Sequence, residues 1–441
     1  MESAVHEPPW PEPSWQDRLE VWLEPFLEVL RHKAQRRWAP VYIAGLLGPG
    51  ARKSVEPMAA RVAPADVQQL HHFVSASPWD PAPLEEVLAR QADALVGGPD
   101  AVLVIDDTAL VKQGRASVGV ARQYCGQLGK TANCQVLVSL TLARCEVPVC
   151  VALRLFLPSA WAADAARREA AGVPAAVPAR PKWQVALDEL DRVQAAGAGF
   201  GCVLADAEYG KAAGFRQGLE ARGLRWALGI LPTQHVYPAG VTTAPAPAPA
   251  RATGRPRKRP VPSAQSRSAA DTIAALPEDA FRPVSWRQGT KGPLSVEFVA
   301  QRVRVADGPP TRDGRHLPGQ TAWLVCERRA NGERKYYLAN HPDDTPLEAL
   351  AADIKARWVC EQGHQQMKEE LGLDHFEGRS WRGLHHHALL TMMALCFLQS
   401  LRLGEKIGGV GGPAPGPTAA QPGLSGAAPG AHAAAGPAAD H

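Results

Sequence analysis

The chain has 441 residues and a formal net charge of +4. This length is enough for two or three domains with a large core, and so small a net charge does not by itself indicate a nucleic-acid partner. Eight cysteines are scattered without a Cys-x-x-Cys pair, which argues against a zinc ribbon or a disulfide framework and favours a reducing cytoplasm. The sequence has no apolar run of membrane-spanning length, so we expect no membrane partner.

The N-terminal region is predicted to be helical. Residues 1–14 are rich in proline and acid, and we expect them to be disordered. Between residues 15 and 97, apolar residues recur at three- and four-residue spacing, which is typical of amphipathic helices. After a first helix that contains Leu19 and Leu30, we expect helices at Trp38–Leu47, Asp66–Val74 and Leu84–Leu95. A plain helical bundle and a DNA-contacting domain both fit this region, which has no clear helix-turn-helix signature.

Segment 98–237 opens with a buried strand that runs into two acids. Ala101–Ile105 is apolar and leads directly into Asp106 and Asp107. Such a strand places negative charge at a sheet edge, where a cation or hydrogen-bond donors must neutralise it; a turn cap is the alternative role. The same pattern recurs where an apolar run ends in Asp206. With further strands and helices expected at 134–143, 147–157, 181–196, 212–222 and 225–231, the segment predicts a mixed sheet covered by helices.

Two segments separate this core from a late helix. Residues 238–270 are rich in proline and alanine and carry a basic run made up of Arg255, Arg257, Lys258 and Arg259. Such a segment cannot fold alone, so it is either a solvated linker or an electrostatic grip on a phosphate backbone. Residues 271–345 return to alternating β patterns with several aromatics, among them Trp286. We expect a small β-insertion, in which these aromatics can be plain core residues.

The segment 346–403 contains a helix with a polar stripe. The members of the stripe stand at offsets of −4, 0, +3, +4 and +7 from one glutamate and are Arg357, Glu361, His364, Gln365 and Lys368. These spacings share one helical face, which fits an exposed ion-pair ladder or part of a site. A further helix, Leu384–Leu403, begins with three adjacent histidines. They cannot all face one metal, so we expect them at the surface or facing phosphate. Residues 404–441 are rich in Gly, Pro and Ala, which predicts disorder.

Two aspartates at the ends of neighbouring strands and one glutamate on a late helix can converge on one spot. Three carboxylates repel one another unless divalent cations lie between them. Hard oxygen ligands without paired Cys and His favour Mg²⁺ or Mn²⁺ over zinc. A site with two such ions about 3.5–4 Å apart activates a water or hydroxyl and stabilises the leaving oxygen in phosphoryl transfer.

Several motifs resemble those of the DDE transposases of bacterial insertion sequences. Arg357-x-x-x-Glu361-x-x-x-x-x-x-Lys368 is similar to their Tyr-x-x-Arg-x-x-x-Glu-x-x-x-x-x-x-Lys signature, with Ile354 in place of the tyrosine. More locally, the stretches 117–124 and 129–135 resemble a subfamily known as DDE superfamily endonucleases. The resemblance covers roughly residues 15–403. It implies an α/β, RNase H-like mixed sheet with flanking helices, interrupted by the β-insertion and preceded by the helical N-terminal domain.

The resemblance also implies roles for single residues. It gives a metal-binding, catalytic role to Asp107, Asp206 and Glu361. Asp107 is chosen over Asp106 because the aspartate of the family immediately precedes a threonine, as Asp107 precedes Thr108.

Further residues are implied to bind DNA. By the same resemblance, Arg357 and Lys368 would contact phosphates near the scissile bond. Trp286 would stack on a flipped base.

The implied activity is metal-dependent cleavage of DNA at the ends of an insertion element, followed by strand transfer into target DNA. Two Mg²⁺ or Mn²⁺ ions would serve as cofactors. The partners would be double-stranded DNA, in the form of terminal inverted repeats and target, bound by a homodimer in the bacterial cytoplasm at the nucleoid. A catalytically inactive DNA-binding relic is the alternative, because a relic can keep all three acids. A haloacid-dehalogenase-type phosphatase would need Asp-x-Asp, and Thr108 stands where its second aspartate belongs.

Overall fold

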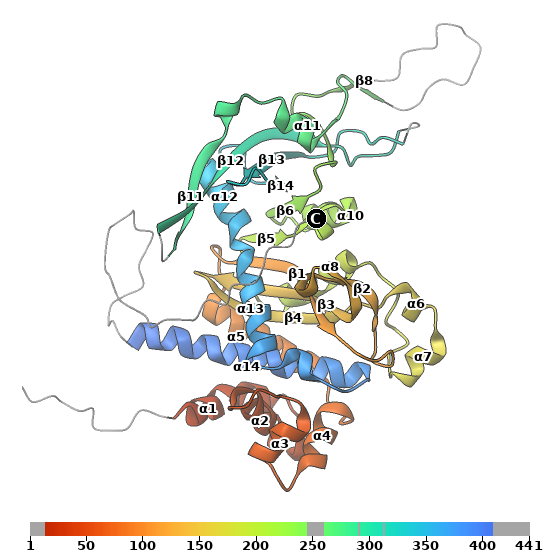
Figure 1. Ribbon diagram of the computed structural model, residues 1–441, viewed down its shortest axis with the longest axis vertical. Coiled ribbons are helices and arrows are strands. Elements are labelled where there is room, and N and C mark those ends of the chain that lie inside the picture. Colours follow the sequence, from red (N-terminus) through yellow and green to blue (C-terminus); the bar gives the residue numbers. More distant parts are fainter. Residues whose placement is uncertain (1–13, 245–259, 290–291, 312–313, 409–441) are drawn as a thin grey trace, which may run out of the picture.

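The computed structural model describes residues 14–244, 260–289, 292–311 and 314–408. Its N-terminal region is a helical bundle at the bottom of Figure 1, with α1 Trp15–Glu28, α2 Lys33–Leu47, α3 Val55–Val62, α4 Val67–Ser75 and α5 Ala82–Val96. Ser14 caps α1, because its Oγ accepts from the Asp17 N–H (3.2 Å) while the Asp17 carboxylate accepts from the Ser14 N–H (3.0 Å). Helix α3 was not predicted, because it is too short to show a clear periodicity. It buries Met58 and Ala59.

Segment 98–237 forms a mixed sheet with the strands β1 Val102–Val111, β2 Ala121–Cys125, β3 Lys130–Arg144, β4 Val147–Leu155, β5 Cys202–Ala205 and β6 Trp226–Ile230. Strand β1 pairs antiparallel with β3 on one side and parallel with β5 on the other. Strand β5 pairs parallel with β6, and β3 pairs antiparallel with both β2 and β4. The predicted mixed α/β architecture is therefore confirmed.

Helices cover both faces of this sheet. Within this segment, α8 Lys182–Ala195 packs against β3 and β4, and α9 Ala207–Gly210 packs against β5 and β6. Helix α10 Ala213–Ala221 packs against α8 and α9, and the short helices α6 Ser159–Ala162 and α7 Ala165–Ala170 pack against each other. Alternate residues of β1 enter two different cores, as the pleat of a strand requires. Val102 and Val104 pack in the cluster that also holds residues of α12 and α13, whereas Leu103 and Ile105 pack in the larger cluster with α5, α8 and α14.

The strands of segment 271–345 are not a separate sheet but continue the core sheet. These strands are β11 Arg282–Gly289, β12 Gly292–Val305, β13 Thr321–Arg328 and β14 Arg334–Ala339. Ahead of them come β7 His235–Pro238, β10 Arg267–Ser268 and α11 Ala269–Ala274, while β8 Thr243–Ala244 and β9 Val261–Pro262 form a separate two-stranded sheet. Strand β14 pairs antiparallel with β6, and β13, β12 and β7 follow outward. In Figure 1 these strands rise above the core, beyond β5 and β6. The backbone ladder thus joins the insertion to the core.

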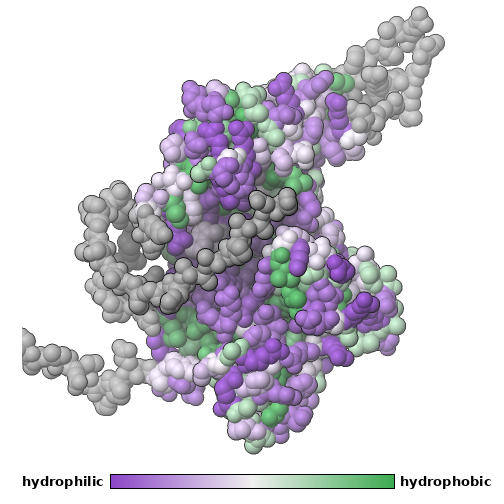
Figure 2. Space-filling view, viewed as in Figure 1, coloured by the Kyte–Doolittle hydropathy of each residue, from purple (hydrophilic) through white to green (hydrophobic). Residues whose placement is uncertain are grey.

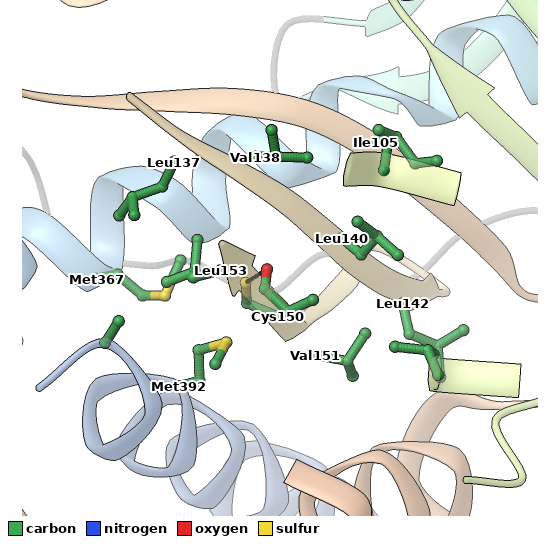
Figure 3. Close-up of a cluster of buried hydrophobic side chains, with 14 of the residues drawn as sticks. Ile105, Leu137, Val138, Leu140, Leu142, Cys150, Val151, Leu153, Met367 and Met392 are labelled. Atoms are coloured by element: carbon green, nitrogen blue, oxygen red, sulfur yellow. Dashed lines mark hydrogen bonds between the residues drawn. The ribbon is translucent and has the colours of Figure 1, made fainter. Parts of the chain in front are cut away.

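The C-terminal helices are α12 Leu347–Ala356, α13 Trp358–Glu369 and α14 Trp381–Gly408. Helix α14 extends past the predicted end at Leu403, into the segment expected to be disordered. Within α14, the stretch Trp381–Gly404 is long and apolar enough to cross a membrane, but 67% of its most apolar 18-residue part is buried inside the protein. It packs against β4, α2, α4 and α5, so it is the core helix of this fold. Figure 3 shows Met392 of α14 and Met367 of α13 facing the β3 and β4 side chains.

The three adjacent histidines are buried, and the prediction that they lie at the surface was wrong. His385 is bonded to the Leu155 N–H at 3.4 Å, and His387 to the Tyr42 hydroxyl at 2.9 Å. His386 stacks on Trp79, with ring centroids 3.5 Å apart. Because consecutive residues point in different directions around a helix, each ring meets a different element. The histidines thereby fasten α14 to the N-terminal bundle and to β4.

Candidate active site

The two adjacent aspartates lie in the middle of β1 and not at its end. Ten consecutive residues of β1 pair with β3, with Asp106 opposite Ser139 and Asp107 opposite Val138. The parallel pairing with β5, however, stops at Ile105. The carboxylates therefore lie beside the end of β5, where β1 continues with β3 as its neighbour on one side only. The expectation that they stand at the end of their own strand was wrong.

Asp106 and Asp107 face opposite sides of the sheet. Asp106 continues the side of Val102 and Val104, which packs against α12 and α13. Its Oδ2 accepts from Arg357 Nη1 at 2.6 Å and lies 3.3 Å from the Cys360 thiol. Burial, together with the neighbouring Asp106 carboxylate, raises the pKa of Cys360 well above its usual range. Asp106 is therefore turned toward the helix that carries Glu361.

The Asp107 carboxylate is occupied on the other side. Its Oδ1 accepts from the Tyr209 hydroxyl at 2.7 Å, and its Oδ2 pairs with the Lys182 ammonium. Burial raises the pKa of Asp107, while Lys182 and Tyr209 oppose this shift. Both oxygens thus have partners from α8 and α9.

Asp206 follows β5 directly and begins α9. Its Oδ1 accepts from the backbone N–H of Glu208 at 2.9 Å and of Tyr209 at 3.4 Å, which is ordinary N-cap geometry. Burial and the nearby Asp106 carboxylate raise the pKa of Asp206 to about 6. Two apolar strands that each lead into an aspartate thus place their carboxylates close together.

The close approach of α9 to β6 depends on a pair of glycines. A Cβ on Gly210 would lie 1.9 Å from the Gly229 carbonyl oxygen, and a Cβ on Gly229 would lie 2.8 Å from the Ala207 nitrogen. Neither position tolerates a side chain without movement of backbone. The glycines therefore let α9 lie against β6, with Asp206 at its start and Tyr209 directed at Asp107.

Glu361 lies on α13, near the start of the predicted stripe. Arg357, at the junction of α12 and α13, donates to Glu361 Oε1 at 3.0 Å and also to Asp106. The guanidinium therefore bridges one carboxylate of the sheet and one of the helix. His364, in contrast, is buried and bonded to Ser139 Oγ at 2.8 Å, and burial lowers its pKa to about 4. Glu361 thus lies beside Arg357, whereas His364 of the same stripe is bonded to the sheet.

These side chains line one pocket of about 540 Å³, whose charged residues include Asp106, Asp107, Asp206, Arg357, Glu361 and Lys368. Lys368 Nζ donates to Gln127 Oε1 at 3.3 Å, in the turn between β2 and β3. The structure thus brings all three predicted acids and two predicted cations to a single cavity.

The other predicted DNA-binding residues lie elsewhere. Trp286 is the extra residue of a bulge between Ser285 and Arg287 in β11, and Lys355 of α12 lies 4.8 Å from the centre of its ring. Its indole nitrogen is buried without a hydrogen-bond partner among the described residues. The basic run made up of Arg255, Arg257, Lys258 and Arg259 falls outside the described residues.

Sequence reasoning missed Lys182 and Tyr209 and passed over Asp106 as a ligand. Lys182 is the first residue of α8, directly after Pro181, and Tyr209 stands three residues after Asp206. The only sequence signal for both is their position in the first turn of a helix. Such signals are common in helices that have no catalytic role.

A sheet that delivers aspartates from two adjacent parallel strands to a pocket bordered by the helix of Glu361 defines an α/β enzyme with a carboxylate cluster. Residues 25–293, more than half of the chain, match the family of DDE superfamily endonucleases, and the chain belongs to that family. This confirms the family predicted from the motifs. Enzymes of this superfamily generally use divalent metal ions. The family match ends before Glu361, so the place of this glutamate in the site rests on its geometry.

The chain was also compared with single proteins. The chain is 26% identical over 361 residues to the probable transposase for insertion sequence element IS701 from Microchaete diplosiphon, covering 79% of this chain and 77% of that one. It also aligns with a piggyBac transposase in a synaptic complex with hairpin DNA, at 9% identity and a TM-score of 0.38. That alignment covers 88% of this chain and 72% of the other.

Proposed function

We propose that this protein is a transposase, which cuts DNA at the ends of its own insertion element and joins those ends to target DNA. The observation that carries the proposal is the position of Arg357, bonded to Asp106 and to Glu361 beside Asp206 in one pocket. The similarity to the IS701 transposase supports the choice of transposition among the reactions of endonucleases.

The proposed fold of the core is RNase H-like. In support, the strands lie side by side in the spatial order β4-β3-β1-β5-β6. Strand β3 is antiparallel to its neighbours β4 and β1, whereas β1, β5 and β6 are parallel to one another. The segments β7 to β14 then extend this sheet before the chain returns with α12 and α13. In this proposal, residues 15–97 form a DNA-contacting domain, and 238–270 together with the β-insertion 271–345 help to hold DNA.

We further propose that Asp106, Asp206 and Glu361 hold the metal ions, two Mg²⁺ or Mn²⁺. The donor set fits such ions, because it consists of carboxylate oxygens and excludes the buried Cys360 thiol, which stays protonated. The sequence analysis gave this metal-binding role to Asp107 from the Asp-Thr motif, and that assignment stays a prediction. Asp106 is preferred because it lies on the side of Glu361, to which Arg357 joins it, whereas Asp107 faces Lys182 and Tyr209 on the other side of the sheet.

Bound divalent ions would activate the attacking oxygen and stabilise the leaving oxygen of the phosphodiester. The protein supplies the remaining parts. Asp107, held by Lys182 and Tyr209, fixes the backbone on which Asp106 sits. Neutral His364 ties α13 to Ser139, and Ser139 Oγ in turn donates to the Asp106 carbonyl oxygen at 2.9 Å. Arg357 is free to exchange its carboxylate partners for a phosphate oxygen, since guanidinium matches both geometrically.

DNA is proposed to bind as double-stranded terminal repeats and target, on a homodimer that holds two ends together in the bacterial cytoplasm. Lys368 would contact phosphate at the pocket rim. Trp286 would have to release Lys355 before it could stack on a base. On the face shown in Figure 2, hydrophilic residues predominate and apolar ones form only small patches, which suits a charged ligand.

The test is cleavage of an end-labelled duplex that carries the element terminus, with Mg²⁺ or Mn²⁺. Asp206→Asn should bind the duplex and fail to nick it, as should the wild type with EDTA. Asp191→Asn is the matched control, because Asp191 is a half-exposed aspartate on α8 that pairs with Arg222 away from the pocket. Nicking by Asp206→Asn at the wild-type rate would refute the site. Binding by the wild type without any nicking would favour the inactive relic.

A further inference from the structure

A second group of potential ligands lies outside the catalytic pocket. Cys202, His341 and Asp353 each present one ligand atom, and all three atoms lie within 4.8 Å of one another. Cys202 is the first residue of β5, whereas Asp206 follows the last. At about 3.3 Å per residue, the two are separated by about 13 Å along the strand. The group is therefore distinct from the carboxylate site at the other end of β5.

Without a cation, this group contains a buried imidazole nitrogen that lacks a hydrogen-bond partner among the described residues, and a buried thiol. His341 Nε2 lies 2.7 Å from Asp353 Oδ2, while Nδ1 of the same buried ring has no hydrogen-bond partner among the described residues. Cys202 is only 3% exposed. Burial, with Asp353 as the next cause, raises the pKa of its thiol well above the usual range. A bound cation would reverse this balance and favour the thiolate.

The three residues are held in place by separate elements. His341 follows β14, where Arg302 Nη1 donates to its carbonyl oxygen at 3.3 Å and the Trp323 indole donates to the Pro342 carbonyl at 3.0 Å. Cys202 is fixed in the β5 ladder. Asp353 stands on α12, whose apolar face packs in the same hydrophobic cluster as Cys202. Such fixed positions lower the cost of assembling a coordination site.

We propose that Cys202, His341 and Asp353 form a binding site for Zn²⁺ or a similar borderline-soft divalent ion. A thiolate, an imidazole and a carboxylate are the ligand types that zinc takes together, at bond lengths that put tetrahedral ligands about 3.3–3.8 Å apart. Shifts of an ångström or less reach this spacing from the observed one. The side chain of Asp353 is 30% exposed, which leaves a path for entry and room for water as a fourth ligand.

Binding is balanced by loss of protons. The Cys202 thiol releases its proton to solvent, and the proton on the ligating nitrogen of His341 moves to the other ring nitrogen. The ion would then join the start of β5, the end of β14 and α12. Since α12 leads directly to Arg357, the site would fasten the helical arm that positions Glu361.

The experiment uses the full chain, reduced and stripped with a chelator, and then titrated with Co²⁺ in excess Mg²⁺. We expect a near-ultraviolet thiolate-to-cobalt band that saturates at one equivalent per chain and disappears when Zn²⁺ is added. Cys202→Ser should lose the band. Cys326→Ser, which changes another fully buried cysteine in β13, should keep it, and so should Asp206→Asn.

A wild-type protein without the band at stoichiometric Co²⁺ would overturn the proposal. A band that survives Cys202→Ser would do the same, because the thiolate would then belong to another residue. If Cys202→Ser does not fold, Asp353→Asn decides, since Asp353 is partly exposed. We expect the Co²⁺ affinity of this variant to fall at least about tenfold, and an unchanged affinity would refute the site.

Discussion

The buried ion pair between Arg216 and Asp307 should be one of the most sensitive points of the fold. The side chains are 1% and 5% exposed, and Arg216 donates to Asp307 Oδ2 through Nε at 3.2 Å and Nη2 at 3.0 Å. Arg216 belongs to α10 of the core, and Asp307 follows β12 of the insertion. Asp307→Ala leaves the guanidinium buried without its counter-charge, which costs about 3–5 kcal/mol.

The matched control is the exposed pair at the end of the same helix. Arg222 and Asp191 are 28% and 51% exposed, so Asp191→Ala should cost at most about 1 kcal/mol. The assay is urea unfolding followed by tryptophan fluorescence, with the two midpoints compared at equal slope. Replacing both partners of the buried pair, by Arg216→Met with Asp307→Leu, should recover much of the loss. Equal destabilisation by the two single alanine variants would refute the reasoning.

Three further predictions follow from charge and burial. Burial lowers the pKa of His386 and His387 to about 4, below an unfolded value of about 6.5. The contribution of the neutral rings to the free energy of unfolding is therefore complete above pH 6.5 and is lost as the pH falls toward 4, by up to about 3 kcal/mol for each ring. Urea unfolding at several pH values should show this loss, and His386→Gln should reduce it. The raised pKa of Asp206, about 6, predicts that Mn²⁺ affinity measured by calorimetry falls about tenfold per pH unit below 6, and a flat profile would exclude Asp206 as a ligand. Neutralising the basic run 255–259 should weaken DNA binding on all sequences and flatten its salt dependence, whereas an unchanged slope would make that run a linker.

The sequence predicted what local chemistry decides. An apolar run followed by Asp206 gave both the strand and the acid at its end, because the aspartate also caps the next helix. The spacing of Arg357 and Glu361 likewise predicted neighbours on one helical stripe, and their side chains are bonded.

Long-range packing decided the rest. Strand β1 continues past its acids because β3 pairs with all ten of its residues, and no local pattern contains that partner. The histidines of α14 look polar in sequence, but Tyr42 and Trp79 from the distant N-terminal bundle enclose two of them. Strand alternation shows that Asp106 and Asp107 face opposite sides. Which side meets Glu361 depends on where α13 packs.

The most direct test of the account compares Asp106→Asn with Asp107→Asn in metal-dependent cleavage of the element-end duplex. We expect Asp106→Asn to lower the cleavage rate by on the order of a thousandfold or more while binding of the duplex persists. Asp107→Asn, which disturbs only the support from Lys182 and Tyr209, should cost about 10- to 100-fold. Full loss of cleavage in Asp107→Asn, with near-normal cleavage in Asp106→Asn, would contradict the proposed metal site and return the role to Asp107.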